Sequence, residues 1–263
     1  AKLWQECADG AAGILLNGAA SDEPVASLCD EAPNSVIALL SISLAGCIFV
    51  PFDPTSPAVR LKTLLDDCNP KLCVCAANSH AELSTRLPTN AKLLALESAI
   101  SDGKSSPVAN SRAHAERTCH LIYTSGSTGV PKAVAVTHQS VGSYCRAKVK
   151  AHAIDESSRV LLASAHTWDP FLGDVLSTLA AGATLISAPR ATIVHALGTT
   201  IRDGAVTHLL ATPSLWSLLE CSYTSPAALP SLQCVALGGE PLPYRLAAPW
   251  LLGNPSAADA AAD

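Results

Sequence analysis

The fold is decided by residues 36–76, which read VIALLSISLAGCIFVPFDPTSPAVRLKTLLDDCNPKLCVCA. Residues 36–44 carry apolar side chains on most sides of a helix, and Gly46 is a typical stop signal. Residues 47–52 then predict a strand, which the Asp53-Pro54 turn ends. This stretch therefore predicts a buried helix that is followed directly by a strand.

A second helix and a second strand follow at once. Ser56 and Pro57 are typical of a helix N-cap and first helical residue, and an apolar stripe continues to about Cys68. Residues 72–76, after the Asn69-Pro70 break, predict another buried strand. Strands that alternate with helices predict parallel pairing, so we expect an α/β fold with mostly parallel β-sheets flanked by helices.

The same alternation returns after a polar, Ser/Ala-rich stretch at 98–117, which predicts a linker or long surface connection. The further predicted strands are 120–123, 133–137, 160–163, 184–187, 208–211 and 233–237, and the predicted helices are 139–152, 171–180, 193–203 and 214–221. We expect a poorly defined segment at 1–24, a first α/β part at 25–117, a second part at 118–253 and a frayed tail at 254–263.

The composition excludes several classes of protein. Of 263 residues, 49% are hydrophobic and 15% are charged, which favours a buried core over disorder. A net charge of −5 without a basic stripe gives no reason to expect nucleic acid. The longest apolar run, 36–51, is interrupted and too short to span a membrane, and we expect no signal peptide. The 10 cysteines form no CxxC pair, so we expect buried thiols, no metal site and a cytoplasmic protein.

The segment most indicative of chemistry is 123–132, YTSGSTGVPK, which lies between two predicted strands. Its glycines permit positive φ and let backbone N–H groups turn inward, its hydroxyls add donors, and its lysine adds charge. This combination suits phosphate oxygens. The predicted ligands are Thr124, Ser125, Gly126, Ser127, Thr128, Gly129 and Lys132. A Walker A loop is excluded because Ala133 follows the lysine. The alternative is a flexible Ser/Gly surface turn.

The stretch 120–138, HLIYTSGSTGVPKAVAVTH, resembles the phosphate loop of the adenylate-forming (AMP-binding) enzymes, which include acyl-CoA synthetases, luciferases and nonribosomal peptide synthetase adenylation domains. Three further stretches resemble the family in the same order: 44–54 (LAGCIFVPFDP), 167–185 (TWDPFLGDVLSTLAAGATL) and 237–241 (LGGEP). The likeness is greatest to amino-acid-activating members, including the β-alanine-activating branch. It implies part of the family's large N-terminal domain.

The resemblance implies a two-step reaction that uses ATP and Mg²⁺. A carboxylate attacks the α-phosphate to give an acyl-adenylate and pyrophosphate, and a thiol of phosphopantetheine or CoA then takes the acyl group. The loop would hold the β- and γ-phosphates. The residues implied to contact adenine are Gly238, Gly239, Glu240 and Pro241. A carrier-protein domain is an implied partner.

Asp169 is implied to choose the substrate, because the matching aspartate in similar amino-acid-activating enzymes pairs with the substrate ammonium. The alternative is that Asp169, which precedes Pro170, caps the following helix. The positions implied to set side-chain specificity are Gly173, Leu210, Val235 and Leu237. They suggest an uncharged, largely apolar side chain or a short ω-amino acid, although the last two also suit ordinary strand core. His138, His166 and His208 are expected to be structural, with His166 near the pocket.

The chain contains no Met and none of the family's later motifs, so we expect a fragment that is inactive alone, and we assign no catalytic residue within it. Three functions stay open. The first is adenylation of an amino acid for transfer to a thiol. The second is an acyl-CoA synthetase that acts on an acid without an amine, and the third is a non-catalytic nucleotide-binding remnant.

Overall fold

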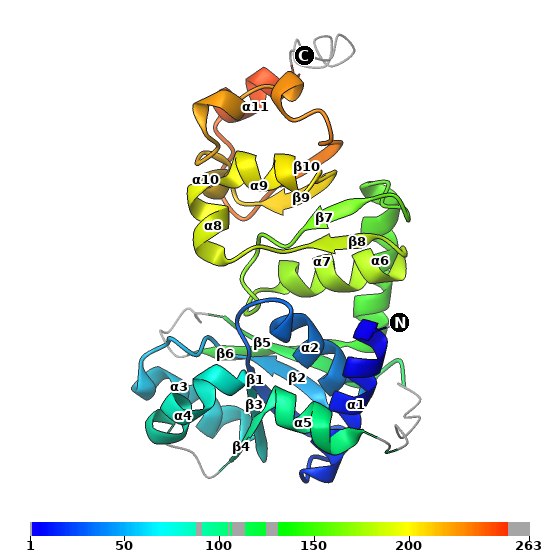
Figure 1. Ribbon diagram of the computed structural model, residues 1–263, viewed down its shortest axis with the longest axis vertical. Coiled ribbons are helices and arrows are strands. Elements are labelled where there is room, and N and C mark those ends of the chain that lie inside the picture. The colour runs from blue at the N-terminus through cyan, green and yellow to red at the C-terminus, as the bar shows by residue number, and fades with distance from the viewer. Residues whose placement is uncertain (1, 88–90, 105, 107–113, 125–130, 252–263) are drawn as a thin grey trace. The chain divides into compact units, whose positions relative to one another are not determined.

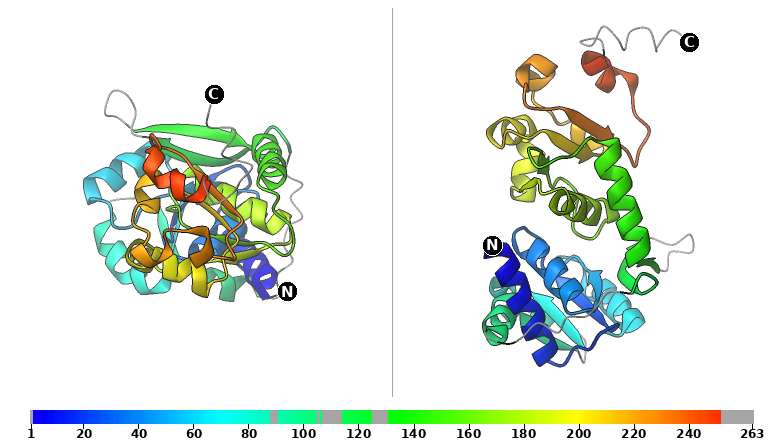
Figure 2. Two further views of the ribbon diagram at one scale, coloured as in Figure 1. Left: turned by 90° about the horizontal axis from the view of Figure 1, so that it is seen from above. Right: turned by 90° about the vertical axis from the view of Figure 1, so that its right-hand side faces the viewer.

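The computed structural model describes residues 2–87, 91–104, 106, 114–124 and 131–251. The chain divides into two compact units (Figures 1 and 2). Unit 1 contains Ala1–Tyr144 and Ala165–Asp169, and unit 2 contains Cys145–Ser164 and Pro170–Asp263. This division differs from the predicted boundary at residue 118, because the predicted second part begins inside the sheet of unit 1.

Unit 1 is built on a six-stranded sheet with the order β4-β3-β1-β2-β5-β6. The strands are β1 (Pro24–Leu28), β2 (Ile48–Pro51), β3 (Leu72–Cys75), β4 (Lys92–Ala95), β5 (Thr118–Thr124) and β6 (Lys132–Thr137). All neighbours pair in parallel except β5 and β6, which form an antiparallel hairpin. The expected α/β class with mostly parallel strands is confirmed.

Helices cover both faces of this sheet. They are α1 (Lys2–Leu16), α2 (Asn34–Leu44), α3 (Ala58–Cys68), α4 (Ala77–Arg86) and α5 (Leu96–Gly103), and α6 (His138–Ala151) leads on into unit 2. Apolar residues of α3 and α4 pack on one face of β1, β2 and β3, while α1, α2 and α5 pack together on the other (Figure 1). Burial on both faces explains why these strands read as continuous apolar runs.

Unit 2 has a four-stranded parallel sheet with the order β10-β9-β7-β8. Its strands are β7 (Arg159–Leu161), β8 (Thr184–Ile186), β9 (His208–Ala211) and β10 (Cys234–Leu237). Its helices are α7 (Asp169–Ala180), α8 (Arg190–His195), α9 (Leu197–Asp203), α10 (Pro213–Trp216) and α11 (Tyr244–Leu251). Side chains of α8, α9 and α10 fill an apolar core against one face of this sheet.

Two predictions about local structure are wrong. The first 24 residues are not poorly defined, because α1 is a 15-residue helix with buried Ala11, Ala12 and Ile14. The supposed linker at 98–117 begins inside α5, which ends at Gly103. In both places small residues stand where a helix usually carries large apolar side chains, so the sequence lacks the usual apolar stripe. A Cβ on Gly13 would lie 1.8 Å from the Ala99 carbonyl oxygen, so α1 and α5 approach too closely for larger side chains.

Smaller corrections concern helix ends. Helix α3 begins at Ala58, its N-cap is Pro57, and no side chain caps it, so Ser56 is not the cap. The helix predicted at 193–203 is two helices divided at Ala196, and the one predicted at 214–221 is a single turn, α10. The predicted tail at 254–263 lies outside the described residues.

Candidate active site

The β5–β6 hairpin presents both ends of the predicted phosphate loop. Thr124 pairs with Lys132 across the hairpin, and the Thr124 hydroxyl donates to the Lys132 carbonyl oxygen at 3.4 Å. Both residues are exposed. The other predicted ligands, Ser125, Gly126, Ser127, Thr128 and Gly129, lie outside the described residues. The structure therefore brings the first and last members of the set together at one edge of the sheet.

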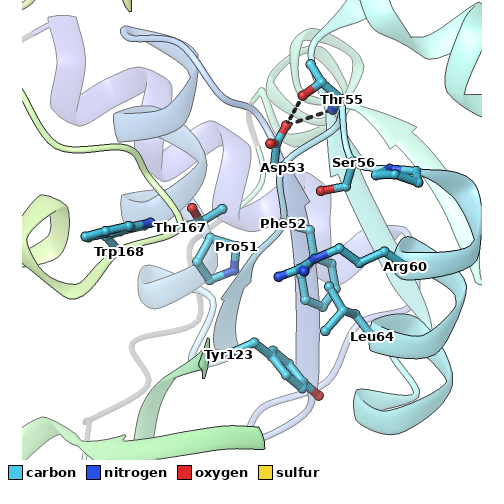
Figure 3. A pocket seen from close by; sticks show the side chains of 11 residues that line it. Pro51, Phe52, Asp53, Thr55, Ser56, Arg60, Leu64, Tyr123, Thr167 and Trp168 are labelled. Carbon is cyan, nitrogen blue, oxygen red and sulfur yellow. Dashed lines mark hydrogen bonds between the residues drawn. The ribbon is translucent and has the colours of Figure 1, made fainter. Parts of the chain in front are cut away.

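A hollow of about 470 Å³ lies in unit 1 at the carboxyl ends of β2 and β5 (Figure 3). Ligands in open parallel sheets bind at such ends. The residues that line it are Pro51, Phe52, Asp53, Thr55, Ser56, Pro57, Arg60, Leu64, Tyr123, Thr167 and Trp168. Tyr123 is the residue directly before Thr124, so the hollow adjoins the point where the predicted loop begins.

Aromatic contacts and hydrogen bonds hold the wall of this hollow. The rings of Phe52 and Tyr123 lie 5.6 Å apart between centroids, and the Tyr123 hydroxyl donates to Asp67 at 2.6 Å. Burial, together with the hydrogen bond to Asp67, raises the pKa of Tyr123 well above its usual range. Tyr123 is therefore a neutral wall residue rather than a proton carrier.

Two histidines of unit 1, His166 and His120, are buried. The Nε2 atom of His166 lies 3.0 Å from the carbonyl oxygen of Phe52, which fixes the segment Ala165–Asp169 beside the hollow. Burial lowers the pKa of His166, so the ring is neutral near pH 7. Burial also lowers the pKa of His120 to about 4, against the opposing effect of the Asp169 charge. His120 Nδ1 has no hydrogen-bond partner among the described residues.

Asp169 is the first residue of α7 and is exposed. Its carboxylate takes no hydrogen bond and no ion pair from any described residue, so it does not cap the helix that it begins. An acidic side chain in the first helical turn is favoured by the helix dipole, but that interaction leaves both oxygens open to a ligand. The described residues therefore show no capping hydrogen bond from the Asp169 side chain, and its role as a ligand for the substrate ammonium stays a prediction.

The strands β9 and β10 separate the residues expected to line the specificity pocket. Val235 and Leu237 lie on one face of β10 and pack against the apolar core that contains Trp216. Leu210 pairs with Ala236, so these two lie on the opposite face. The structure therefore does not bring Leu210 together with Val235 and Leu237. Gly173 lies buried in α7, one turn after Asp169.

The expected adenine segment, Gly238, Gly239, Glu240 and Pro241, follows β10 and is exposed throughout. Gly239 has φ +84°, a conformation that side chains with a Cβ rarely adopt. Glu240 accepts hydrogen bonds from the backbone N–H of Ser214, at 3.1 Å, and from the Ser214 hydroxyl. Glu240 is thus held by the first turn of α10, and the two glycines leave open backbone beside it.

The sequence analysis did not single out Arg60, which lines the hollow. It lies in the first turn of α3, and Figure 3 shows its guanidinium reaching across the hollow. The available signal was its place three residues after Pro57, where a helix starts at the carboxyl edge of a predicted parallel sheet.

In the described part of the chain, no group of three or more His, Cys, Asp or Glu side chains is placed to hold a metal ion. None of the described helices combines the length and apolar character needed to cross a membrane.

A family model described as AMP-binding enzyme matches residues 1–255, so this chain belongs to the AMP-binding enzyme family. It is 32% identical over 249 residues to phosphinothricin tripeptide synthetase PhsC of Streptomyces viridochromogenes, covering 92% of this chain and 22% of that protein. It is 31% identical over 254 residues to novobiocin biosynthesis protein H of Streptomyces niveus, covering 92% of this chain and 41% of that protein. The chain thus spans less than half the length of these relatives.

Solved structures confirm the fold. The crystal structure of the nonribosomal peptide synthetase FmoA3 (S1046A) superposes with a TM-score of 0.85 at 23% identity, over 96% of this chain and 27% of that chain. The expected family and the architecture are therefore confirmed, and the similar proteins include nonribosomal peptide synthetases.

Proposed function

We propose that this chain is part of an enzyme that adenylates an amino acid and passes it to a thiol. Membership of the AMP-binding family and relatives among nonribosomal peptide synthetases support this proposal. ATP would supply the adenylate, and pyrophosphate would leave. The thiol would belong to phosphopantetheine on a carrier protein or to CoA.

The observation that carries the amino-acid assignment is the free carboxylate of Asp169. No described residue donates to it, although it stands at the start of α7 in a segment that His166 fixes. A carboxylate held in place without an ion pair suits a ligand that brings its own ammonium group. An acid without an amine would leave the charge unpaired on binding, which disfavours that substrate.

The phosphate groups of ATP would bind at the open end of the β5–β6 hairpin, with Lys132 as the charged ligand and Thr124 as a hydroxyl donor. Catalysis of phosphoryl chemistry depends mainly on such positioning and charge neutralisation. Mg²⁺ would arrive with the triphosphate, since the described residues offer no metal cluster of their own. Adenine would lie against the open backbone at Gly238 and Gly239.

Strand register bears on where the substrate side chain would lie. If Leu210 lines the pocket, its neighbour on the same face is Ala236, and Val235 and Leu237 support the sheet from the core side. We therefore assign the pocket wall to Leu210 and Ala236, with Gly173 leaving space. This assignment keeps the expectation of an uncharged side chain.

The test is amino-acid-dependent exchange of pyrophosphate into ATP, measured on the protein at its natural length with a panel of amino acids and their deaminated analogues. Asp169→Ala is expected to lower kcat/KM for the preferred amino acid at least about a hundredfold, because the substrate ammonium loses its carboxylate partner. Exchange with a deaminated acid should not fall.

The matched control is Asp203→Ala, which removes an exposed carboxylate whose partner is the neighbouring Arg202. It should leave exchange unchanged. Equal exchange with amino acids and deaminated acids in the unmodified protein would assign the enzyme to the acyl-CoA synthetases instead. Absence of exchange with every acid would favour the non-catalytic remnant.

A further inference from the structure

The hollow of unit 1 contains a cation without a described partner. Arg60 extends from α3 so that its guanidinium lies between the strand side and the helix side of the hollow (Figure 3). No described residue accepts a hydrogen bond from it or forms an ion pair with it. A guanidinium presents planar donors that match the oxygens of phosphate and carboxylate groups.

The surroundings of Arg60 add a hydroxyl group and an aromatic wall to an open hollow. Figure 3 shows the hydroxyl group of Ser56 directed toward the hollow, and Thr167 lines the opposite side. Phe52 and Tyr123 form an aromatic wall of the hollow. The ring carbons of this wall offer the guanidinium no hydrogen-bond acceptor, so they do not compete with an anion for it.

The backbone at Ser56 is held from behind. Arg86 donates to the Ser56 carbonyl oxygen at 3.4 Å and forms an ion pair with Glu82. Thr55 is held as well, because its backbone N–H and its hydroxyl both donate to Asp53, at 2.8 and 2.6 Å. The segment that carries the Ser56 hydroxyl is therefore positioned before any ligand binds.

The location of the hollow indicates which anion would reach it. Tyr123 lines the hollow and precedes Thr124, where the predicted phosphate loop begins, and β5 pairs with β2, whose end supplies Phe52. The hollow therefore adjoins, within the same unit, the strand end from which the predicted loop begins.

We propose that this hollow binds a pyrophosphate group through Arg60, Ser56 and Thr167. The inference rests on the proposed function, in which adenylation releases pyrophosphate at the neighbouring loop. The step is binding only, and no bond is made or broken in the hollow. The group could be free pyrophosphate or the β- and γ-phosphates of bound ATP, which share the same oxygen chemistry.

Asp53 gives the proposal a second, oppositely signed consequence. It is the carboxylate among the described residues that line the hollow, and its charge opposes any anion there. Removing that charge should tighten anion binding, whereas removing Arg60 should weaken it. A hollow without an anion function would show neither response.

The experiment is calorimetric titration of the protein at its natural length with inorganic pyrophosphate, ATP and AMP at fixed ionic strength. Arg60→Gln is expected to weaken pyrophosphate binding about tenfold, which corresponds to the loss of one charge-assisted hydrogen-bonded contact. Asp53→Asn is expected to strengthen it a few-fold. AMP, which lacks the pyrophosphate group, should bind all variants equally.

Lys62→Gln is the matched control, because Lys62 lies on the same helix, carries the same charge and does not line the hollow. It should leave pyrophosphate binding unchanged. Weaker binding of pyrophosphate but not ATP to Arg60→Gln would identify a product site, and equal weakening of both would identify a site for the ATP phosphates.

Pyrophosphate and ATP affinities that are the same in Arg60→Gln and Lys62→Gln would overturn the proposal. Lys132→Gln separates this failure from failure of the proposed function. If it weakens ATP binding while Arg60→Gln has no effect, the adenylation proposal survives and the second site does not. If neither Lys132→Gln nor Arg60→Gln changes ATP or pyrophosphate binding, both proposals fall.

Discussion

Helix α7 contains two aspartates in opposite environments, one exposed in its first turn and one buried in a later turn. Asp169 is exposed, and its carboxylate has no described partner. The side chain of Asp174, five positions later, is 1% exposed and pairs with Lys148 of α6, whose side chain is 4% exposed. Burial raises the pKa of Asp174 to about 6, although the lysine charge opposes that shift. A carboxylate that the fold has already paired serves the fold, and one left unpaired at an edge is available to a ligand.

The largest expected effect comes from breaking the buried pair. Lys148→Met should lower the free energy of unfolding by about 3–5 kcal/mol, because it leaves the Asp174 carboxylate buried without its cation. Urea denaturation followed by circular dichroism measures this change. Lys150→Met, an exposed position on the same helix, should stay within about 0.5 kcal/mol of the unmodified protein. Equal effects of the two substitutions would show that the pair is not structural.

Replacing both partners should recover most of that loss. Lys148→Met combined with Asp174→Leu removes both charges and fills the space with apolar groups, which is often neutral for a buried pair. We expect the double variant to be more stable than Lys148→Met alone by about 2 kcal/mol, in the same urea assay. A double variant that is as unstable as the sum of two single losses would contradict a purely pairwise role.

The raised pKa of Asp174 predicts a pH dependence with a definite sign. Between the ordinary value of 3.8 and about 6, the folded protein keeps a proton that the unfolded chain releases. This contribution is therefore fully present below pH 3.8 and is lost as the pH rises through about 6. The stability difference between the unmodified protein and Asp174→Asn should fall by about 1–3 kcal/mol across this window.

The comparison with Asp174→Asn also isolates the effect from His120. Burial lowers the pKa of His120 to about 4, which makes stability rise with pH over an overlapping window. Both proteins contain His120, so its contribution cancels in the difference. Urea denaturation at a series of pH values and constant ionic strength gives the curve. A flat difference, or one that rises with pH, would mean that Asp174 is ionised throughout.

The smallest expected effect is that of Asp169→Asn on stability. Because no described residue bonds to this carboxylate, the substitution should change the free energy of unfolding by no more than about 0.5 kcal/mol. The same urea assay applies. A loss above about 1 kcal/mol would reveal that Asp169 supports the helix after all, and the contrast between the two turns of α7 would then weaken.

The sequence predicted the elements best where a single apolar run between clear breaks identifies a buried strand. The strands at 72–76 and 208–211 are apolar runs between clear breaks, and the structure has them as Leu72–Cys75 and His208–Ala211. It predicted worst where two elements depend on each other. The sequence of helix α1 looks irregular because it contains Gly10 and Gly13. These positions leave no room for a Cβ, since Ser41 and Ala99 lie too close, and a local sequence pattern does not contain such distant neighbours.

The candidate site divides in the same way. The polar loop and the resemblance to the family could be recognised from residues 120–138 alone. The motif consists of glycines, hydroxyl residues and a lysine at fixed local spacing, so its recognition needs no information about distant residues. Strand pairing, by contrast, separated Leu210 from Val235 and Leu237, since neighbouring residues of a strand point to opposite faces. Packing likewise paired Asp174, left Asp169 free and turned Arg60 into the hollow. Those outcomes depend on contacts between residues far apart in the chain, which local spacing does not encode.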